Sequence, residues 1–538
     1  MRQAGLRSFW GWGYAGAGPN DAQVDGMRTA LSAMFGAEIA PAVPEPQLDD
    51  IDLLTPRIDA PAALETICSA DPSSRASHTY GKGFRDVVRA LRRDFSCPPD
   101  IVARPRNEAD VVAVLDWCSE VNAAAIPYGG GSSVVGGTEA RVGDSYQGVV
   151  SLDLGELDRV VEIDPASRAA RIEAGIFGPA LEDALRPQGL TLRHFPQSFE
   201  FSTLGGWIAT RSGGHYATRA THIDDFVESV RVVAPSGVIE TRRLPGSGAG
   251  PSPDRLFLGS EGSLGVITEA WMRLQDRPVW RANVSVRFGE FLDACDAARR
   301  IVQAGLWPAN CRVLDAGEAQ TAGAGDGTHS VLIVGFESAQ HPVDVLLGQA
   351  LEHARDAGGA AAEPTVTGPE SDAAGTRDGA AGSWRSAFLN APYMRDALAR
   401  LGMITETFET AVTWDRFGDF HAVVTQRVRA LVEESCGTGR VTCRLTHVYP
   451  DGAAPYFTVI APSRPEVQLE VWDEIKAAAM EVVVASGGTV THHHAVGRDH
   501  RPGYDTQIPG GFRDALAAAK HSLDPAWILN PGVLLDPP

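Results

Sequence analysis

The sequence has no apolar run long enough to cross a bilayer, and no apolar region follows its first basic residues. The longest apolar runs, such as residues 482–485, fall far short of the roughly 20 residues that a membrane-spanning helix requires. Arg2 and Arg7 are not followed by the hydrophobic segment of a secretory signal. We therefore expect a cytoplasmic protein whose contact with a membrane is at most peripheral.

Cysteine is scarce and basic residues are outnumbered. The seven cysteines form no Cys-x-x-Cys pair, and an odd number of them indicates reduced thiols, not a disulfide framework. Lys and Arg total 47 against 68 Asp and Glu, which gives a net charge of −21. A phosphate backbone selects for basic surface, so a nucleic-acid partner is disfavoured. An anionic ligand would have to be bound by a local basic cluster.

A chain of 538 residues exceeds what one hydrophobic core usually supports, so we expect two or more domains. The alternation of strand and helix patterns predicts an α+β protein. After an appendage over 1–95, a β-α-β unit begins with a strand at 101–103. Its helix carries Val111, Val114, Leu115 and Cys118 on one face, and its second strand, 124–127, ends in a glycine loop.

A second region of alternating strand and helix patterns begins after Pro278. Strands and helices alternate again up to about residue 505, and 506–538 form a tail that we expect to return to the interface between the domains. We therefore divide the chain at 1–95, 96–278, 279–505 and 506–538. Residues 358–383 are rich in Ala and Gly without apolar periodicity, which predicts a mobile surface loop.

Three turns of small residues follow one another in the first large domain. Pro127–Ser133 reads PYGGGSS, and Gly205-Gly206 and 262–265 are similar turns. Glycines let backbone N–H groups approach an anion closely, so three such turns suit an elongated dinucleotide. The first turn has neither the lysine of a P-loop nor the spacing of a Rossmann fingerprint, and taken alone it could also be a flexible hairpin.

The order of several motifs along the chain resembles that of a known protein family. The motifs PYGGGSS, SFEFSTLGGWIATR (198–211) and GSEGSLGVITEA (259–270) resemble the flavin-binding domain of the vanillyl-alcohol oxidase superfamily. Together with WGWGY (10–14), FETAVTWDR (408–416) and THHHAVGR (491–498), they resemble the alkyl-dihydroxyacetonephosphate synthase family over nearly the whole chain. The resemblance implies an α+β fold with a two-subdomain FAD-binding domain at 96–278 and an α+β cap domain at 279–505.

The resemblance also implies FAD as the cofactor. The glycine loop is not followed by a histidine or cysteine that could link to the flavin, so we expect non-covalent FAD. The implied cofactor-binding residues are those of the three turns and their neighbours: Pro127, Tyr128, Gly129, Gly130, Gly131, Ser132, Ser133, Ser198, Glu200, Ser202, Thr203, Gly205, Gly206, Trp207, Ser260, Glu261, Gly262, Ser263, Gly265 and Ile267.

Three consecutive histidines, His492, His493 and His494, follow a Gly-Gly turn and the run Thr-Val-Thr. This pattern predicts a strand, in which neighbouring side chains point to opposite faces, so the three imidazoles could not bind one ion. We therefore expect no metal. A tract without function is the simple alternative, whereas the resemblance implies a catalytic cluster that exchanges protons near neutral pKa and holds an anionic phosphate.

Three further residues match the family. Tyr456 matches the active-site tyrosine, which could move a proton if nearby cations lower its pKa. Arg395 matches the arginine that contacts the acyl carboxylate, and Arg312 matches another substrate-binding arginine. Without the family, Tyr456 would be read as a core tyrosine and each arginine as a surface ion pair.

The implied reaction exchanges the acyl chain of acyl-dihydroxyacetone phosphate for a long-chain alcohol, a step of ether lipid synthesis without net redox change. The alternatives are an FAD-dependent dehydrogenase or oxidase of a 2-hydroxy acid or alcohol, and a flavin-binding protein without catalysis. We expect a lipid-like or small anionic substrate and a homodimer. Ala495 replaces the family's glycine, and 498–511 lack its lysine-rich stretch, so the phosphate end of the substrate could differ.

Overall fold

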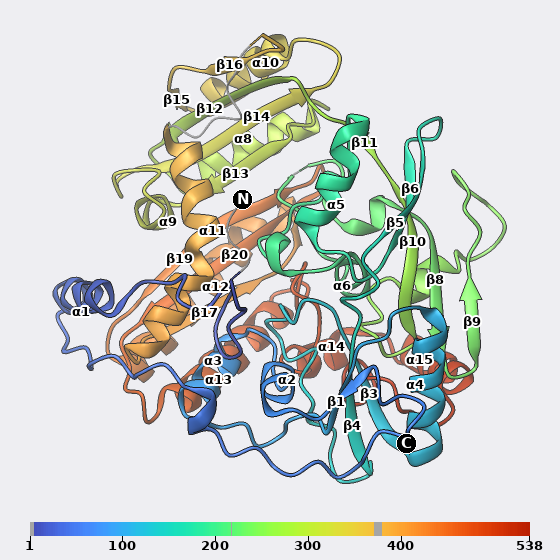
Figure 1. The fold of residues 1–538 in the computed structure, drawn as a ribbon. Coiled ribbons are helices and arrows are strands. Elements are labelled where there is room, and N and C mark those ends of the chain that lie inside the picture. Colours follow the sequence, from blue (N-terminus) through green and yellow to red (C-terminus); the bar gives the residue numbers. More distant parts are fainter. Residues whose placement is uncertain (1–4, 217, 371–378) are drawn as a thin grey trace.

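A computed structural model describes residues 5–216, 218–370 and 379–538. In this part of the chain, three larger sheets with flanking helices build the molecule (Figure 1). The α+β class predicted from the sequence is confirmed. None of the described helices is both long and apolar enough to pass through a bilayer.

The first sheet carries the predicted β-α-β unit. Its strand order is β1 (Cys68–Ser69), β2 (Ile101–Ala103), β4 (Gly148–Asp153), β3 (Ala123–Tyr128), and β2, β4 and β3 run parallel. Helix α4 (Glu108–Val121) begins at Asn107, whose side chain accepts a hydrogen bond from the N–H of Asp110. The predicted apolar face of α4 is buried. Because β3 ends at Tyr128, the glycine loop starts at the carboxyl edge of this sheet.

The second sheet is antiparallel and ends the first half of the chain. Its order is β5 (Val160–Asp164), β6 (Ala169–Glu173), β10 (Val266–Arg273), β8 (Val227–Ala234), β9 (Gly237–Glu240). Helices α5 (Gly178–Leu185) and α6 (Leu204–Thr210) share its hydrophobic core. A two-stranded pair, β7 (Leu190–Thr191) with β11 (Gln275–Asp276), and the short helix α7 (Asp254–Phe257) complete this region.

The third sheet is the largest and begins just after Pro278. Its main path is β15 (Ala360–Ala361), β12 (Trp280–Phe288), β14 (Ser330–Ser338), β13 (Asn310–Leu314), β19 (Arg440–Val448), β20 (Gly452–Ala461), β17 (Ile404–Glu409). Strand β16 (Thr365–Thr367) pairs with β12, and β18 (Val412–Thr413) pairs with β20. Residues 449–451 form the turn that joins β19 to β20 in an antiparallel hairpin.

Helices cover this sheet and close its core. They are α8 (Phe291–Gln303), α9 (Ala316–Thr321), α10 (Asp344–Asp356), α11 (Gly379–Arg400), α12 (Trp414–Cys436) and α13 (Gln468–Ala485). From the N-terminal appendage, α3 (Phe84–Leu91) inserts Phe84, Val87, Val88 and Leu91 into the same core, while α1 (Asp21–Phe35) packs against α11 and α2 (Pro72–Ser77) lies near β2. The appendage is therefore integrated into the cap.

The prediction of a mobile loop over 358–383 is partly wrong. Residues 360–361 and 365–367 pair with β12, and helix α11 begins at Gly379. Cross-strand pairing to an existing edge orders a segment that lacks apolar periodicity of its own. Residues 371–378 lie outside the described part of the chain.

The last residues return to the first sheet. After α14 (Arg501–Gln507) and α15 (Gly510–Leu523), Leu529 forms a parallel bridge with Ala125 of β3. Lys520 of α15 is buried, and its ammonium donates to the Asp524 carboxylate and to the carbonyls of Ser263 and Leu529. One buried cation thus ties the tail to the turn at 260–265.

Replacing Lys520 by Met should lower the free energy of unfolding by about 3–5 kcal/mol, because Asp524 would remain buried without its cation. Chemical denaturation measures this change. The adjacent, exposed His521→Ala variant is the control and should stay within about 0.5 kcal/mol of the parent. Equal stability of the two variants would contradict the anchoring role of Lys520.

Candidate active site

The three small-residue turns lie against one another. A Cβ on Gly130 would meet the carbonyl oxygen of Phe201 at 1.9 Å, and one on Gly262 would meet the Cγ of Pro127 at 2.7 Å. Glycine is therefore required where the loop 127–133 contacts the neighbouring turns. The Oγ of Ser260 is buried here without a protein partner. A close-packed glycine cradle with an unused hydroxyl fits a dinucleotide held by backbone N–H groups.

Several of the predicted cofactor residues hold these turns in place. The Oγ1 of Thr203 caps α6 by accepting from the N–H of Gly206, and the indole of Trp207 donates to the Oγ of Ser202. The Oγ of Ser133 accepts from the N–H of Gly137. These side chains shape the cradle through contacts within the protein.

Glu261 connects the cradle to the loop that follows the histidines. Its carboxylate accepts from the N–H groups of Val496 and Gly497, both at 2.8 Å, and its carbonyl accepts from Asn530. Its own N–H donates to the carbonyl of Ala209. Burial raises the pKa of this carboxyl to about 7. Every polar group of Glu261 is engaged in the protein, so the structure gives it a positioning role.

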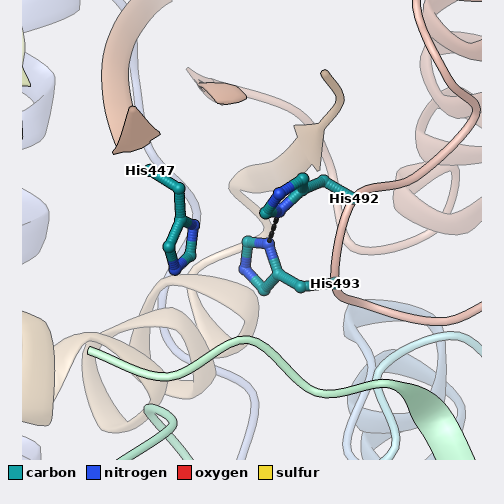
Figure 2. Close-up of side chains that lie close together, drawn as sticks. All are labelled: His447, His492 and His493. Atoms are coloured by element: carbon teal, nitrogen blue, oxygen red, sulfur yellow. Dashed lines mark hydrogen bonds between the residues drawn. The ribbon is translucent and has the colours of Figure 1, made fainter. Parts of the chain in front are cut away.

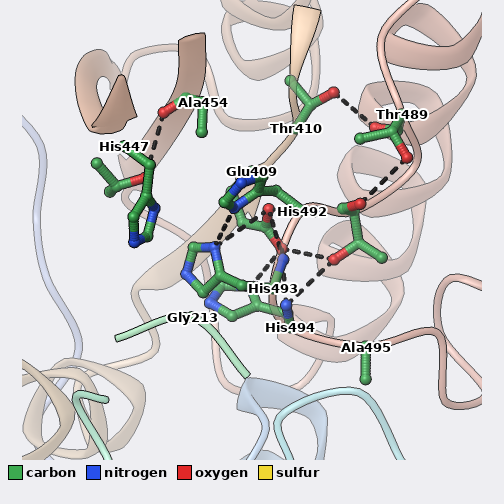
Figure 3. A network of polar contacts seen from close by, with 12 residues as sticks. Gly213, Glu409, Thr410, His447, Ala454, Thr489, His492, His493, His494 and Ala495 are labelled. Atoms are coloured by element: carbon green, nitrogen blue, oxygen red, sulfur yellow. Dashed lines mark hydrogen bonds and ion pairs between the residues drawn. The ribbon is translucent and has the colours of Figure 1, made fainter. Parts of the chain in front are cut away.

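A buried carboxylate organises the histidine run. Glu409 ends β17, its side chain is 0% exposed, and its oxygens accept from the N–H groups of His492, His493 and His494 (Figure 3). The hydroxyl of Thr491 also donates to it. Nearby imidazoles and these hydrogen bonds hold the pKa of Glu409 well below its usual range despite its burial. Glu409 is not among the site residues predicted from the sequence, although it lies within the FETAVTWDR motif.

The prediction that the histidines continue a strand is wrong. Residues 491–494 form a bend that wraps around the Glu409 carboxylate, because three consecutive N–H groups cannot point to one acceptor from a strand. The alternation argument against a shared ion therefore does not hold. The imidazoles also differ from the expected neutral-pH range, since burial lowers the pKa of His492 to about 3 and that of His493 well below its usual value.

Residues from two other segments complete the cluster. The hydroxyl of Tyr449 lies 2.7 Å from the Nε2 of His492, and the Nε2 of His222 lies 3.2 Å from the same atom. His447, near the end of β19, lies beside His492, with ring centroids 5.0 Å apart and the ring planes tilted by 35°. Isolated histidines and tyrosines at these positions carry no sequence signal, so sequence reasoning could not find them.

Tyr456 lies in the same cluster. It points from β20 to the rings of His493 and His494, with centroid distances of 6.2 and 5.6 Å. The guanidinium of Arg444 lies over its ring at 3.7 Å and pairs with Glu318. Burial raises the pKa of the phenol, and Arg444 opposes this shift. The phenol is therefore protonated at neutral pH, with a cation and imidazoles beside it.

The two predicted arginines lie in different surroundings. Arg312 is 2% exposed, donates to the carbonyl of His215, stacks on Trp384 at 4.4 Å, and keeps a buried Nε without a protein partner. Burial lowers its pKa to about 9. It can therefore still receive an anionic group.

The guanidinium of Arg395 contacts other parts of the protein. Its Nε and one terminal nitrogen donate to Asp396, and the other terminal nitrogen donates to the carbonyl of Lys82. Asp396 in turn accepts from the N–H of Trp12. Each of its three nitrogens thus donates one hydrogen bond within the protein, which gives Arg395 a positioning role between α11 and the N-terminal segment, and its contact with a substrate carboxylate stays a prediction.

Comparisons with known proteins agree with this architecture. Residues 99–242 match the model of the FAD binding domain, and residues 277–534 match that of the C-terminal domain of FAD linked oxidases. An alkyldihydroxyacetonephosphate synthase of Trypanosoma brucei brucei is 29% identical over 87% of this chain and 78% of its own length, and one of Dictyostelium discoideum is 28% identical over 86% and 78%. A solved alkyldihydroxyacetonephosphate synthase has the same fold, with a TM-score of 0.78, 24% identity and 98% coverage of both chains.

The chain is an FAD-linked flavoprotein with a cap domain. This class is defined by the two matched domains, together with the glycine cradle and the histidine cluster. FAD is its cofactor. Within this class the chain is a homologue of the alkyldihydroxyacetonephosphate synthases, which confirms the resemblance carried by the motifs.

Glu409→Gln should disorder the histidine bend, because an amide offers one acceptor oxygen and directs its NH2 at backbone donors. We expect a loss of about 2–3 kcal/mol in the free energy of unfolding and of about a hundredfold in turnover. Denaturation and steady-state kinetics measure the two effects. Glu433→Gln, on an exposed part of α12, is the matched control; wild-type turnover in Glu409→Gln would refute the anchoring role.

Gly130→Ala should weaken FAD binding by at least about tenfold, or about 1.4 kcal/mol, because the new methyl group would overlap the carbonyl of Phe201. Visible absorbance and fluorescence titration of the purified variant report FAD content. Gly26→Ala, in α1 with open space around it, should bind FAD as the parent does. A full complement of FAD in Gly130→Ala would show that the loop is not part of the cradle.

Proposed function

We propose that this chain is an alkyldihydroxyacetonephosphate synthase. It exchanges the acyl chain of acyl-dihydroxyacetone phosphate for a long-chain alcohol: the bond from carbon to the carboxylate oxygen breaks, a bond to the alcohol oxygen forms, and a fatty-acid carboxylate leaves together with the proton of the alcohol. No electrons are gained or lost overall. The support is homology over most of the chain together with the cluster of Tyr456, Arg444 and the histidines.

The histidine loop contacts the FAD-binding half of the chain. A Cβ on Gly213 would meet the Cβ of His493 at 3.0 Å, and Glu261 ties Val496 and Gly497 to the turn at 260–265. FAD would be held by the backbone of 127–133 and the hydroxyl of Ser260, and supplies an electron-accepting ring when bound. The cap cluster therefore faces the half of the chain that holds the cofactor.

Each side chain can be given a role from its surroundings. The protonated phenol of Tyr456 can donate or recover a proton at Oη, with Arg444 stabilising the phenolate that this leaves. The neutral imidazole of His494 beside it can accept that proton. The unpaired Nε of Arg312 can bind an anionic oxygen of the substrate. In a site shielded from water such charge stabilisation contributes several kcal/mol.

Further properties belong to the same proposal. The seven cysteines are unpaired, which supports a cytoplasmic location. We propose non-covalent FAD, a lipid-like anionic substrate, a homodimer, peripheral contact with a membrane and no nucleic-acid partner, in keeping with the net charge of −21.

Two assays on the same protein distinguish the synthase from a dehydrogenase and from a binding protein without catalysis. The synthase should exchange the acyl group for a labelled long-chain alcohol without an electron acceptor. Lasting bleaching of the flavin by a 2-hydroxy acid under anaerobic conditions would instead establish a dehydrogenase. FAD-loaded protein that performs neither reaction would favour a binding protein without catalysis.

Tyr456→Phe should reduce synthase turnover by about 10²- to 10⁴-fold, the usual contribution of a proton-transferring group. FAD content should remain that of the parent, because the contacts of the Tyr456 ring are with His493, His494 and Arg444 and the change keeps that ring. Tyr80→Phe, whose hydroxyl donates to the carbonyl of Asp94 outside the cluster, is the matched control. Parental turnover in Tyr456→Phe would remove Tyr456 from the mechanism.

A further inference from the structure

Three imidazoles from two distant segments meet beside the cofactor-binding half. His447 is the last residue but one of β19, while His492 and His493 belong to the bend held by Glu409 (Figure 2). One nitrogen from each ring can be chosen so that all three lie within 4.8 Å of one another, and the Nδ1 atoms of His492 and His493 are 3.0 Å apart. Donor atoms at such separations can share one ion.

The hydrogen bond of His447 determines which of its nitrogens is free. Its Nε2 lies 2.9 Å from the carbonyl oxygen of Gly214. A carbonyl can only accept, so Nε2 carries the hydrogen and the Nδ1 of the neutral ring keeps its lone pair. This Nδ1 is buried and has no partner among the described residues, in a side chain only 2% exposed. In Figure 2 a ring nitrogen of His447 faces the other two imidazoles.

His492 has the same arrangement on its outer side. Its Nε2 lies 2.7 Å from the hydroxyl of Tyr449, which can accept a hydrogen from that nitrogen and leave Nδ1 as the donor atom. Histidines that bind a metal usually donate their second N–H to an oxygen in this way, which fixes the tautomer and the ring orientation.

The surroundings also favour a cation. Behind the bend lies the Glu409 carboxylate, whose side chain is 0% exposed and whose Oε2 is 3.5 Å from the Nδ1 of His493. A buried negative charge next to the donor atoms offsets part of the cost of placing a cation there. Three neutral imidazoles are a donor set that suits Zn²⁺ and leaves a fourth coordination position open.

We propose that His447, His492 and His493 form a binding site for a divalent transition-metal ion, with Zn²⁺ as the ion that this donor set favours. The open position would accept a water or an anionic oxygen. That a phosphate or carboxylate oxygen of the substrate occupies it rests on the proposed function, whereas metal binding itself does not.

Metal content tests the site without any substrate. FAD-loaded protein is stripped with a chelator and titrated with Zn²⁺ by calorimetry, and Co²⁺ serves as the spectroscopic probe. We expect one tight equivalent per chain and the intense visible bands of a tetrahedral Co²⁺ site. No Zn²⁺ binding above that of the same protein kept in excess chelator, or Co²⁺ bands of an octahedral aquo ion alone, would overturn the proposal.

Two kinds of variant locate the ion. His447→Ala and His493→Ala should each weaken Zn²⁺ binding by at least about a hundredfold, and Tyr449→Phe should weaken it by about tenfold. His329→Ala, at a half-exposed histidine outside the cluster, should bind as the parent does. Retained FAD absorbance shows that a variant is folded. If the alanine variants lose FAD, Tyr449→Phe and the Co²⁺ spectrum of the parent decide, and unchanged affinity in Tyr449→Phe would count against the site.

The Zn²⁺ titration tests the metal site, and the synthase assay tests the proposed function, so either proposal can be rejected without the other. Stoichiometric Zn²⁺ binding in a protein that exchanges no acyl group would leave the metal site standing and reject the proposed function. Acyl exchange in metal-free protein that binds no Zn²⁺ would do the reverse.

Discussion

The buried carboxylate of Glu409 is the interaction on which the cap side of the active site depends. Its charge cannot be left unpaired inside the protein, and the chain satisfies it with consecutive backbone N–H groups of 492–494. These hydrogen bonds bend the backbone, so that the imidazoles contact different neighbours. His492 contacts Tyr449, and His493 and His494 contact Tyr456. The imidazoles supply the reactive groups, and Glu409, distant in the sequence, determines where they point.

A second buried carboxylate, that of Glu261, accepts hydrogen bonds from the backbone at the other end of the histidine loop. Glu261, with φ of +50°, accepts from Val496 and Gly497, so the segment that leaves the histidines is fixed to the cofactor turn. The loop 491–497 is thus held at one end by the cap and at the other by the FAD-binding half. Any relative movement of the two halves must break hydrogen bonds to a buried carboxylate, which is costly. The spacing between cofactor and histidines is therefore stiff.

Local patterns sufficed for much of the fold. The β-α-β unit, the hairpin β19–β20 and the glycine turns follow from periodicity and from small residues at turns. The histidine bend could not be predicted, because Glu409 lies more than 80 positions away and overrides the β preference of Thr-Val-Thr. Arg444 was missed for a similar reason: it alternates with Val441, Cys443 and Leu445, a pattern that predicts a solvated face, yet Tyr456 and Glu318 cover it. The resemblance assigned Arg395 to a substrate, and the structure adds the ion pair with its neighbour Asp396.

The return of the tail to β3 has a consequence for biosynthesis. Asn530 donates to the carbonyls of Gly137 and Glu261, and Leu529 lies beside Ala125, so residues 528–530 bridge the loop after the glycine cradle and the turn at 260–265. A ribosome makes these residues some 400 positions after the cradle itself. The tail can therefore add its contacts to the two turns only near the end of synthesis, whereas the contact of Gly262 with Pro127 needs no tail residue. For most of its synthesis the nascent chain thus carries a cradle that lacks the hydrogen bonds of Asn530.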